Sequence, residues 1–179
     1  MKYGIEVDGR GKCFNKSIPV TLNGNKLNDK INFISKYKFY LAFENSHHCS
    51  DYITEKLYTN SFLAGSVPIV WGPKKSDYEA VLPKHSFIFF DDYKDNITEL
   101  AEYLNYLDRN QTAYAEYFKW RFLKPENIHG NQHLDGNCKL CIALKKQETF
   151  TFKRNIIKSI YSWIFENENL ECFNATSKI

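Results

Sequence analysis

Residues 37–73 read YKFYLAFENSHHCSDYITEKLYTNSFLAGSVPIVWGP, and this stretch decides the fold class. Residues 37–43 are mostly aromatic and apolar, as in a buried strand. Residues 67–71 form a second apolar, β-branched run that ends at Gly72-Pro73, and they predict another buried strand. Between them, residues 53–64 carry apolar side chains at helical spacing before Gly65, a favourable C-cap residue: Ile53, Leu57, Tyr58 and Phe62. The order strand, helix, strand predicts a parallel pair joined by a crossover helix.

The same alternation continues toward the C-terminus. Residues 86–90 predict a strand that ends at Asp91-Asp92. Asn96 is a good N-cap, with Glu99 three residues on, for a helix with one apolar stripe: Ile97, Leu100, Ala101, Leu104 and Leu107. A further helix is expected over residues 112–122, with Tyr114, Tyr117 and Phe118 facing inward. The fold class is therefore α/β, with a parallel sheet covered by helices on both faces.

The two ends of the chain are less regular in pattern. Residues 3–7 alternate in polarity and predict an opening strand before a turn at Asp8-Gly9, and residues 14–32 are polar and predict a loop. Residues 125–150 lack a clear period, whereas residues 156–164 suggest an amphipathic helix. We therefore expect one lobe over residues 1–150, followed by a C-terminal amphipathic helix and tail over residues 151–179.

Composition limits the classes of function. Apolar residues make up 43% of the chain and the net charge is only +3, which fits a globular domain and argues against a nucleic-acid-binding protein. No run approaches the roughly 20 apolar residues of a membrane helix, and the first residues lack a signal-peptide pattern. Even so, four N-glycosylation sequons hint at secretion: Asn15, Asn96, Asn110 and Asn174. The five cysteines are an odd number, so at least one thiol must be free or pair outside this sequence.

Glu55 and Lys56 fall in the first turn of the helix that follows the first central strand. A lysine opposes the helix dipole there, and a bound diphosphate would relieve that conflict. Glu55 could accept hydrogen bonds from a ribose, as acids do in other nucleotide-binding units. The alternative is a simple surface pair between Lys56 and Asp51. Lys74 and Lys75 are expected in an ordinary solvated loop.

Several motifs resemble those of the α1,3/4-fucosyltransferases, glycosyltransferase family ten. The donor-site motifs are FYLAFENS (39–46), DYITEKL (51–57) and LAGSVPIVWGP (63–73). Further resemblances are SFIFFDDY (86–93), YLNYLDRN (103–110), YFKWR (117–121) and CKLC (138–141). Together they extend from about Tyr3 to Cys141, which is far more than one short motif would give by chance.

The resemblance implies the C-terminal, Rossmann-like lobe of a GT-B glycosyltransferase with GDP-fucose as its donor. In the family, residues that match Tyr40, Asn45, Tyr52, Glu55 and Lys56 line the donor site. The chemistry is transfer of L-fucose to GlcNAc of glycoprotein or glycolipid glycans in α1,3 linkage, with inversion and without a metal or other cofactor. No catalytic base is expected in this chain, because the family places the base, the acceptor groove and the membrane anchor in an N-terminal part. The full-length protein is expected on the lumenal side of the Golgi membrane.

One departure from the family pattern lies at SHHCSD (46–51), which is about one residue longer and could shift Tyr52 relative to Asn45. A zinc site built from His47, His48 and Cys49 together with the CKLC cysteines is a weaker interpretation, since only one CxxC is present. The resemblance instead implies that Cys138 and Cys141 form structural disulfides.

Two functions therefore compete on the sequence. The first is a fucosyltransferase in glycan synthesis, of which this chain alone is expected to be inactive. The second is a truncated, non-catalytic module that binds GDP-fucose. A third possibility is an unstable remnant with an exposed interface.

Overall fold

The computed structural model of the 179-residue chain describes residues 4–21, 25–46, 49, 52–123 and 159. In chain order the elements are η1 (Lys12–Phe14), α1 (Lys26–Ile34), β1 (Phe39–Phe43), α2 (Glu55–Leu57), η2 (Tyr58–Phe62), β2 (Val67–Trp71), α3 (Lys75–Val81), β3 (Ile88–Phe89), η3 (Phe90–Tyr93), α4 (Ile97–Arg109), α5 (Gln111–Glu116) and η4 (Lys119–Phe122). η2 is a π-helical turn, whereas η1, η3 and η4 are 3₁₀ turns.

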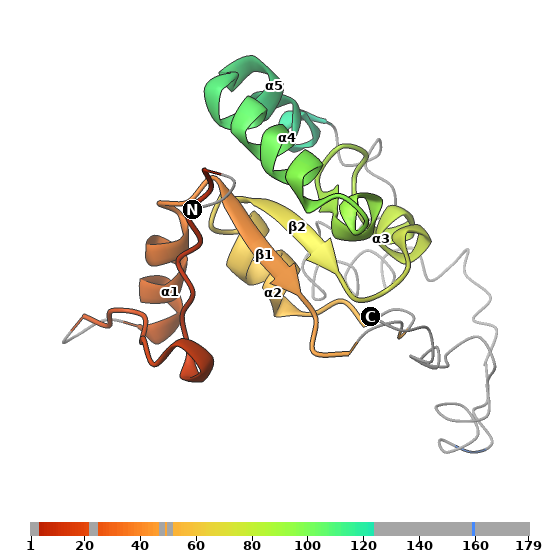
Figure 1. Cartoon of the computed structure of the whole chain (residues 1–179). Coiled ribbons are helices and arrows are strands. Elements are labelled where there is room, and N and C mark those ends of the chain that lie inside the picture. The colour runs from red at the N-terminus through yellow and green to blue at the C-terminus, as the bar shows by residue number, and fades with distance from the viewer. Residues whose placement is uncertain (1–3, 22–24, 47–48, 50–51, 124–158, 160–179) are drawn as a thin grey trace.

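The strands form a parallel sheet in the order β1-β2-β3. Phe39 pairs with Val67 at one end of the β1–β2 ladder, and Phe43 pairs with Trp71 at the other. The carboxyl ends of β1 and β2 therefore lie together, and the loops that lead to α2 and α3 start side by side. Figure 1 shows α2 behind the strands, α4 and α5 at the top and α1 at the left.

Each face of the sheet carries its own apolar cluster. Alternate residues of β2 point to opposite faces, so Val67 and Ile69 join one cluster while Val70 joins the other. The first cluster is completed chiefly by α4, through Leu100, Leu104 and Leu107. The second contains Ala42 and residues of and beside α2 and α3: Leu57, Tyr78 and Leu82. A parallel sheet covered by helices on both faces was the expected arrangement, and it is confirmed.

The central elements agree with the sequence prediction. β2 has the predicted bounds, β1 and β3 lie within theirs, and α4 follows Asn96, whose side chain accepts a hydrogen bond from the Glu99 backbone amide at 3.2 Å. The helix predicted over residues 53–64 appears as α2 followed by η2, and Gly65 has the positive φ (81°) expected after a helix end. Tyr58, one of the four residues at helical spacing, is 43% exposed.

Four local predictions were wrong. Residues 4–10 form no strand, because none of the described residues supplies them with a ladder partner, although Ile5 still packs on the α4 face. The predicted loop 14–32 contains most of α1, which Asn25 caps by accepting from the Leu27 amide at 2.9 Å. Lys74 and Lys75 do not lie in a loop: they cap and begin α3. The helix predicted over residues 112–122 is broken into α5 and the 3₁₀ turn η4.

Candidate functional site

Glu44, which directly follows β1, is the residue on which the site is built. Its backbone amide donates to the Trp71 carbonyl at 2.9 Å, which extends the β1–β2 ladder by one bond. Its side chain is almost fully buried, with 1% exposed. Gly72 has φ 144°, and a Cβ there would stand only 2.8 Å from the Glu44 Cβ. The absence of a side chain at residue 72 therefore leaves room for the Glu44 carboxylate.

The buried carboxylate is satisfied by the start of α2. Glu44 Oε1 accepts from the Thr54 backbone amide at 2.8 Å, and Oε2 accepts from the Thr54 hydroxyl at 2.8 Å. Lys56 Nζ donates to Glu44 Oε2 at 3.0 Å and forms an ion pair with it. A carboxylate removed from water requires this kind of compensation, because an unpaired buried charge is very costly. The loop between β1 and α2 is thus fastened to the helix start.

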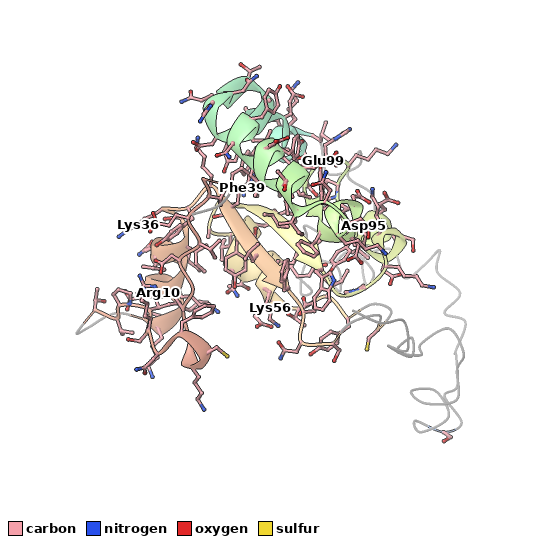
Figure 2. All side chains as sticks on the ribbon, viewed as in Figure 1. Arg10, Lys36, Phe39, Lys56, Asp95 and Glu99 are labelled. Atoms are coloured by element: carbon pink, nitrogen blue, oxygen red, sulfur yellow. The ribbon has the colours of Figure 1, made fainter. Side chains whose placement is uncertain are left out.

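Lys56 is held in this network and remains charged. Its side chain is 20% exposed, and burial by itself lowers its pKa, but the hydrogen bond and charge of Glu44, with the charges of Glu55 and Tyr52, together raise the pKa by more. The net effect is a pKa above the ordinary lysine value. Figure 2 shows Lys56 near the end of the sheet toward which β1 points, and Phe39 at the opposite end.

The surface pair between Lys56 and Asp51 considered from the sequence is replaced by this buried pair with Glu44. Asp51 itself lies outside the described residues. The sequence interpretation gave Glu44 itself no role, although this residue lies within the FYLAFENS motif. A usable signal was its place at the carboxyl end of a predicted central strand, where ligand-binding residues gather in parallel sheets.

The helix start has the predicted polar character. Thr54 is the N-cap, and its hydroxyl accepts from the Lys56 amide at 3.4 Å. Glu55 is exposed in the first turn. One ammonium and one accessible carboxylate therefore meet at the positive end of α2, at the carboxyl edge of the sheet, where an anion with attached hydroxyl groups could be bound.

The other three predicted donor-site residues, Tyr40, Tyr52 and Asn45, differ in their exposure to solvent. Tyr40 is half-buried on β1, and its hydroxyl lies close enough to Lys56 and Glu55 for their charges to affect its pKa. Tyr52 is 37% exposed, and its charge contributes to raising the pKa of Lys56. Asn45 is exposed and has no hydrogen bond to any of them among the described residues. Glu55 and Lys56 thus lie together at the start of α2, the charges of Lys56 and Tyr40 or Tyr52 influence one another, and Asn45 lies exposed on the adjoining loop.

A cavity of about 510 Å³ lies elsewhere, along α3 and β3. Its walls include Lys75, His85, Phe87 and Tyr93, and none of the five predicted donor-site residues lines it. We place the candidate site by its side-chain chemistry at the β1 edge, because this cavity has no network of buried polar groups comparable to that of Glu44.

The cysteines and sequons can be followed only in part. Cys49 is buried and disulfide-bonded, so its sulfur is not a thiolate, whereas Cys13 is an exposed free thiol. His47, His48, Cys138, Cys141 and Asn174 lie outside the described residues. Asn15 is exposed in a left-handed turn, while Asn96 and Asn110 use their side chains as helix N-caps.

In the part of the chain that is described, no three His, Cys, Asp or Glu side chains converge on a metal position, and no helix is long and apolar enough to span a membrane.

Comparison with known proteins identifies what this chain is similar to. The family model "Glycosyltransferase family 10 (fucosyltransferase) C-term" matches residues 1–163. The human 4-galactosyl-N-acetylglucosaminide 3-alpha-L-fucosyltransferase 9 is 55% identical over 161 residues, which cover 88% of this chain and 41% of that protein. Bovine alpha-(1,3)-fucosyltransferase 4 is 42% identical over 134 residues (74% and 32%), and human 3-galactosyl-N-acetylglucosaminide 4-alpha-L-fucosyltransferase FUT3 is 44% identical over 131 residues (73% and 34%). The chain thus spans about a third to two fifths of the length of these relatives.

Proposed function

The chain belongs to glycosyltransferase family 10, the fucosyltransferases, and from this premise we propose that the β1 edge of its sheet binds GDP-fucose for fucosyl transfer. The observation that carries the proposal is the Lys56 ammonium, which Glu44 holds in the first turn of α2, at the positive end of that helix. A diphosphate is the part of the donor that such a cluster would bind. In this proposal the chain is the Rossmann-like donor lobe of a GT-B enzyme.

Each residue then has a definite task. Lys56, together with the positive end of α2, balances the negative charge that grows on GDP as its bond to fucose breaks. Glu55, exposed beside them, accepts hydrogen bonds from sugar hydroxyls, and Tyr40 and Tyr52 border the nucleotide. Because a lysine supplies the positive charge, the proposed reaction needs no metal ion.

The acceptor side of the reaction is proposed for the whole enzyme. Displacement with inversion needs a base that takes the proton of the acceptor hydroxyl, and we assign that base to a part of the enzyme beyond this chain. The names of the relatives support a galactosyl-N-acetylglucosaminide acceptor, with α1,3 transfer to GlcNAc as in fucosyltransferase 9. Such transfer modifies glycoprotein and glycolipid glycans, and we propose the lumenal side of the Golgi membrane as its place.

The proposal is tested by titrating GDP into the chain and its lysine variants by calorimetry. Lys56→Ala should weaken GDP binding about ten- to a hundredfold, because a charge-assisted contact to phosphate contributes about 1.5 to 3 kcal/mol. Lys75→Ala is the matched control, since Lys75 also lies in the first turn of a helix and also pairs with a carboxylate, Asp92. It should change the affinity less than about threefold.

Thermal unfolding of each variant must accompany the titration, because Lys56→Ala also leaves Glu44 without its cation. Equal losses of GDP affinity in the folded Lys56 and Lys75 variants would show that only overall positive charge matters, and the site would be misplaced. If the wild type binds GDP but a restored full-length enzyme transfers no fucose to a lactosamine acceptor, the non-catalytic binding module would be the better description.

A further inference from the structure

Asn60 is a buried polar residue that the donor-site motifs leave without a task. It lies in η2 and is 2% exposed. Its Nδ2 donates to the Tyr40 hydroxyl oxygen at 3.1 Å, while its Oδ1 has no hydrogen-bond partner among the described residues. An unsatisfied buried oxygen is costly and rare, so such a residue usually has a reason to be retained.

Packing does not supply that reason. The neighbouring cluster on this face of the sheet is apolar and includes Ala42, Leu57 and Val70. A leucine would suit those surroundings at least as well as an amide does. Asn60 also belongs to a π-helical turn, in which the Leu63 amide bonds to the Tyr58 carbonyl at 2.9 Å, and such turns are rare and frequently found at functional sites.

The hydrogen bond from Asn60 sets the direction of the Tyr40 hydroxyl. Because the Tyr40 oxygen accepts from Asn60, its own proton is directed elsewhere, and no described residue accepts it. Burial raises the pKa of Tyr40, against the lowering effects of the Asn60 hydrogen bond and the Lys56 charge, so the phenol keeps its proton at neutral pH. Asn60 follows Lys56 by four residues, about one helical turn, so its bond to the Tyr40 hydroxyl brings this donor within about a turn of the candidate site.

We propose that Asn60 is a positioning residue for nucleotide binding: by donating to the Tyr40 oxygen it orients the Tyr40 O–H toward an oxygen atom of the bound GDP. This inference rests on the proposed function, because it requires that GDP binds at the β1 edge. Asn60 does not touch the nucleotide and acts only through Tyr40, which makes the two residues a coupled pair.

A double-mutant cycle on the 179-residue chain, with GDP as the titrant, tests this coupling. Tyr40→Phe removes the donor and should weaken GDP binding roughly tenfold. Asn60→Leu keeps the branched shape and the number of heavy atoms, frees the hydroxyl to rotate and should weaken binding about five- to tenfold. In the Tyr40→Phe background, Asn60→Leu should cost less than about twofold, since the group it orients is already gone.

Tyr114→Phe is the matched control, because Tyr114 is another half-buried tyrosine, whose hydroxyl donates to the Lys38 carbonyl at 2.8 Å. It should lower the melting temperature and leave GDP affinity unchanged. The inference is overturned if Asn60→Leu and Tyr40→Phe weaken binding additively, or if folded Asn60→Leu binds GDP as the wild type does. A wild type that binds no GDP would instead remove the proposed function itself, and this inference with it.

Discussion

Two lysine–carboxylate pairs stand at the same edge of the sheet, and they differ in burial rather than in chemistry. Lys56 follows β1 and pairs with Glu44 at 3.0 Å, and their side chains are 20% and 1% exposed. Lys75 follows β2 and pairs with Asp92 at 2.5 Å, with 45% and 44% exposed. The pair with the shorter N···O distance, Lys75–Asp92, is the more exposed of the two. Separation alone is therefore a poor guide to the importance of an ion pair, because solvent screens the exposed pair and leaves the buried one dependent on its partner.

Deleting the acid of each pair should give the largest contrast. Glu44→Ala leaves the Thr54 amide and the Lys56 ammonium without their acceptor, and it should lower the free energy of unfolding by about 3 to 5 kcal/mol. Asp92→Ala should lower it by less than about 1 kcal/mol. Urea unfolding followed by circular dichroism measures both. Similar losses in the two variants would mean that burial does not separate the pairs.

The glycine beside Glu44 offers a second and smaller contrast. Gly72→Ala places a methyl group against the Glu44 side chain at a φ of 144°, so we expect a loss of about 2 to 3 kcal/mol. Gly65→Ala is the control: its φ is also positive, at 81°, but an added Cβ there meets nothing within 4 Å. It should cost only about 1 kcal/mol of backbone strain. Equal unfolding free energies for the two variants would show that strain alone, and no contact with Glu44, fixes the cost at Gly72.

The contrast between the pairs also shows what the sequence can predict. β2 and α4 were predictable because local signals coincide there: a β-branched run in one, and an N-cap with an apolar stripe in the other. α3 was missed because Gly72-Pro73 and two lysines read as a loop, although Asp77 accepts from the Lys74 amide and supports the helix start. α1 was missed because its helix is polar and buries only Ile34.

The candidate site was predictable only where one helix start carries it. Glu55 and Lys56 are neighbours of an N-cap, so their place followed from local rules. Glu44 and Asn60 were not found, because their roles depend on partners 12 and 20 residues away in the chain. Local patterns do not encode such pairings when both members look like ordinary polar residues. Burial of a polar side chain is a property of the tertiary structure, and it is this burial that marks both residues.

Raising the salt concentration should change the stability costs of the two acid deletions differently, by an amount below about 1 kcal/mol. At 1 M NaCl the screening length falls to about 3 Å, so the small cost of Asp92→Ala should vanish. The cost of Glu44→Ala should keep most of its low-salt value, because the Glu44 carboxylate is only 1% exposed and solvent ions screen it little. Urea unfolding at 0.05 M and 1 M NaCl gives both differences. A cost of Glu44→Ala that falls in the same proportion as that of Asp92→Ala would indicate that the Glu44 pair is accessible to solvent ions.

The smallest expected effect is the alkaline titration of Lys56. Burial lowers the pKa of this lysine, but Glu44, with smaller contributions from Glu55 and Tyr52, raises it by more, so the folded-state pKa lies above the ordinary value of 10.5. A raised pKa means that the stability contributed by the pair is complete below pH 10.5 and is lost as the pH rises through the folded-state pKa. Burial also raises the pKa of Tyr114 to about 12, but that titration is common to wild type and variant and cancels in their difference.

The difference in unfolding free energy between wild type and Lys56→Met should therefore stay constant from pH 7 to 10 and shrink above pH 10.5. Lys75→Met, which breaks the exposed pair, should differ little from wild type at any of these pH values. A Lys56→Met difference that persists unchanged to pH 11.5 would show that the lysine stabilises the fold through its packing and not through its charge on Glu44.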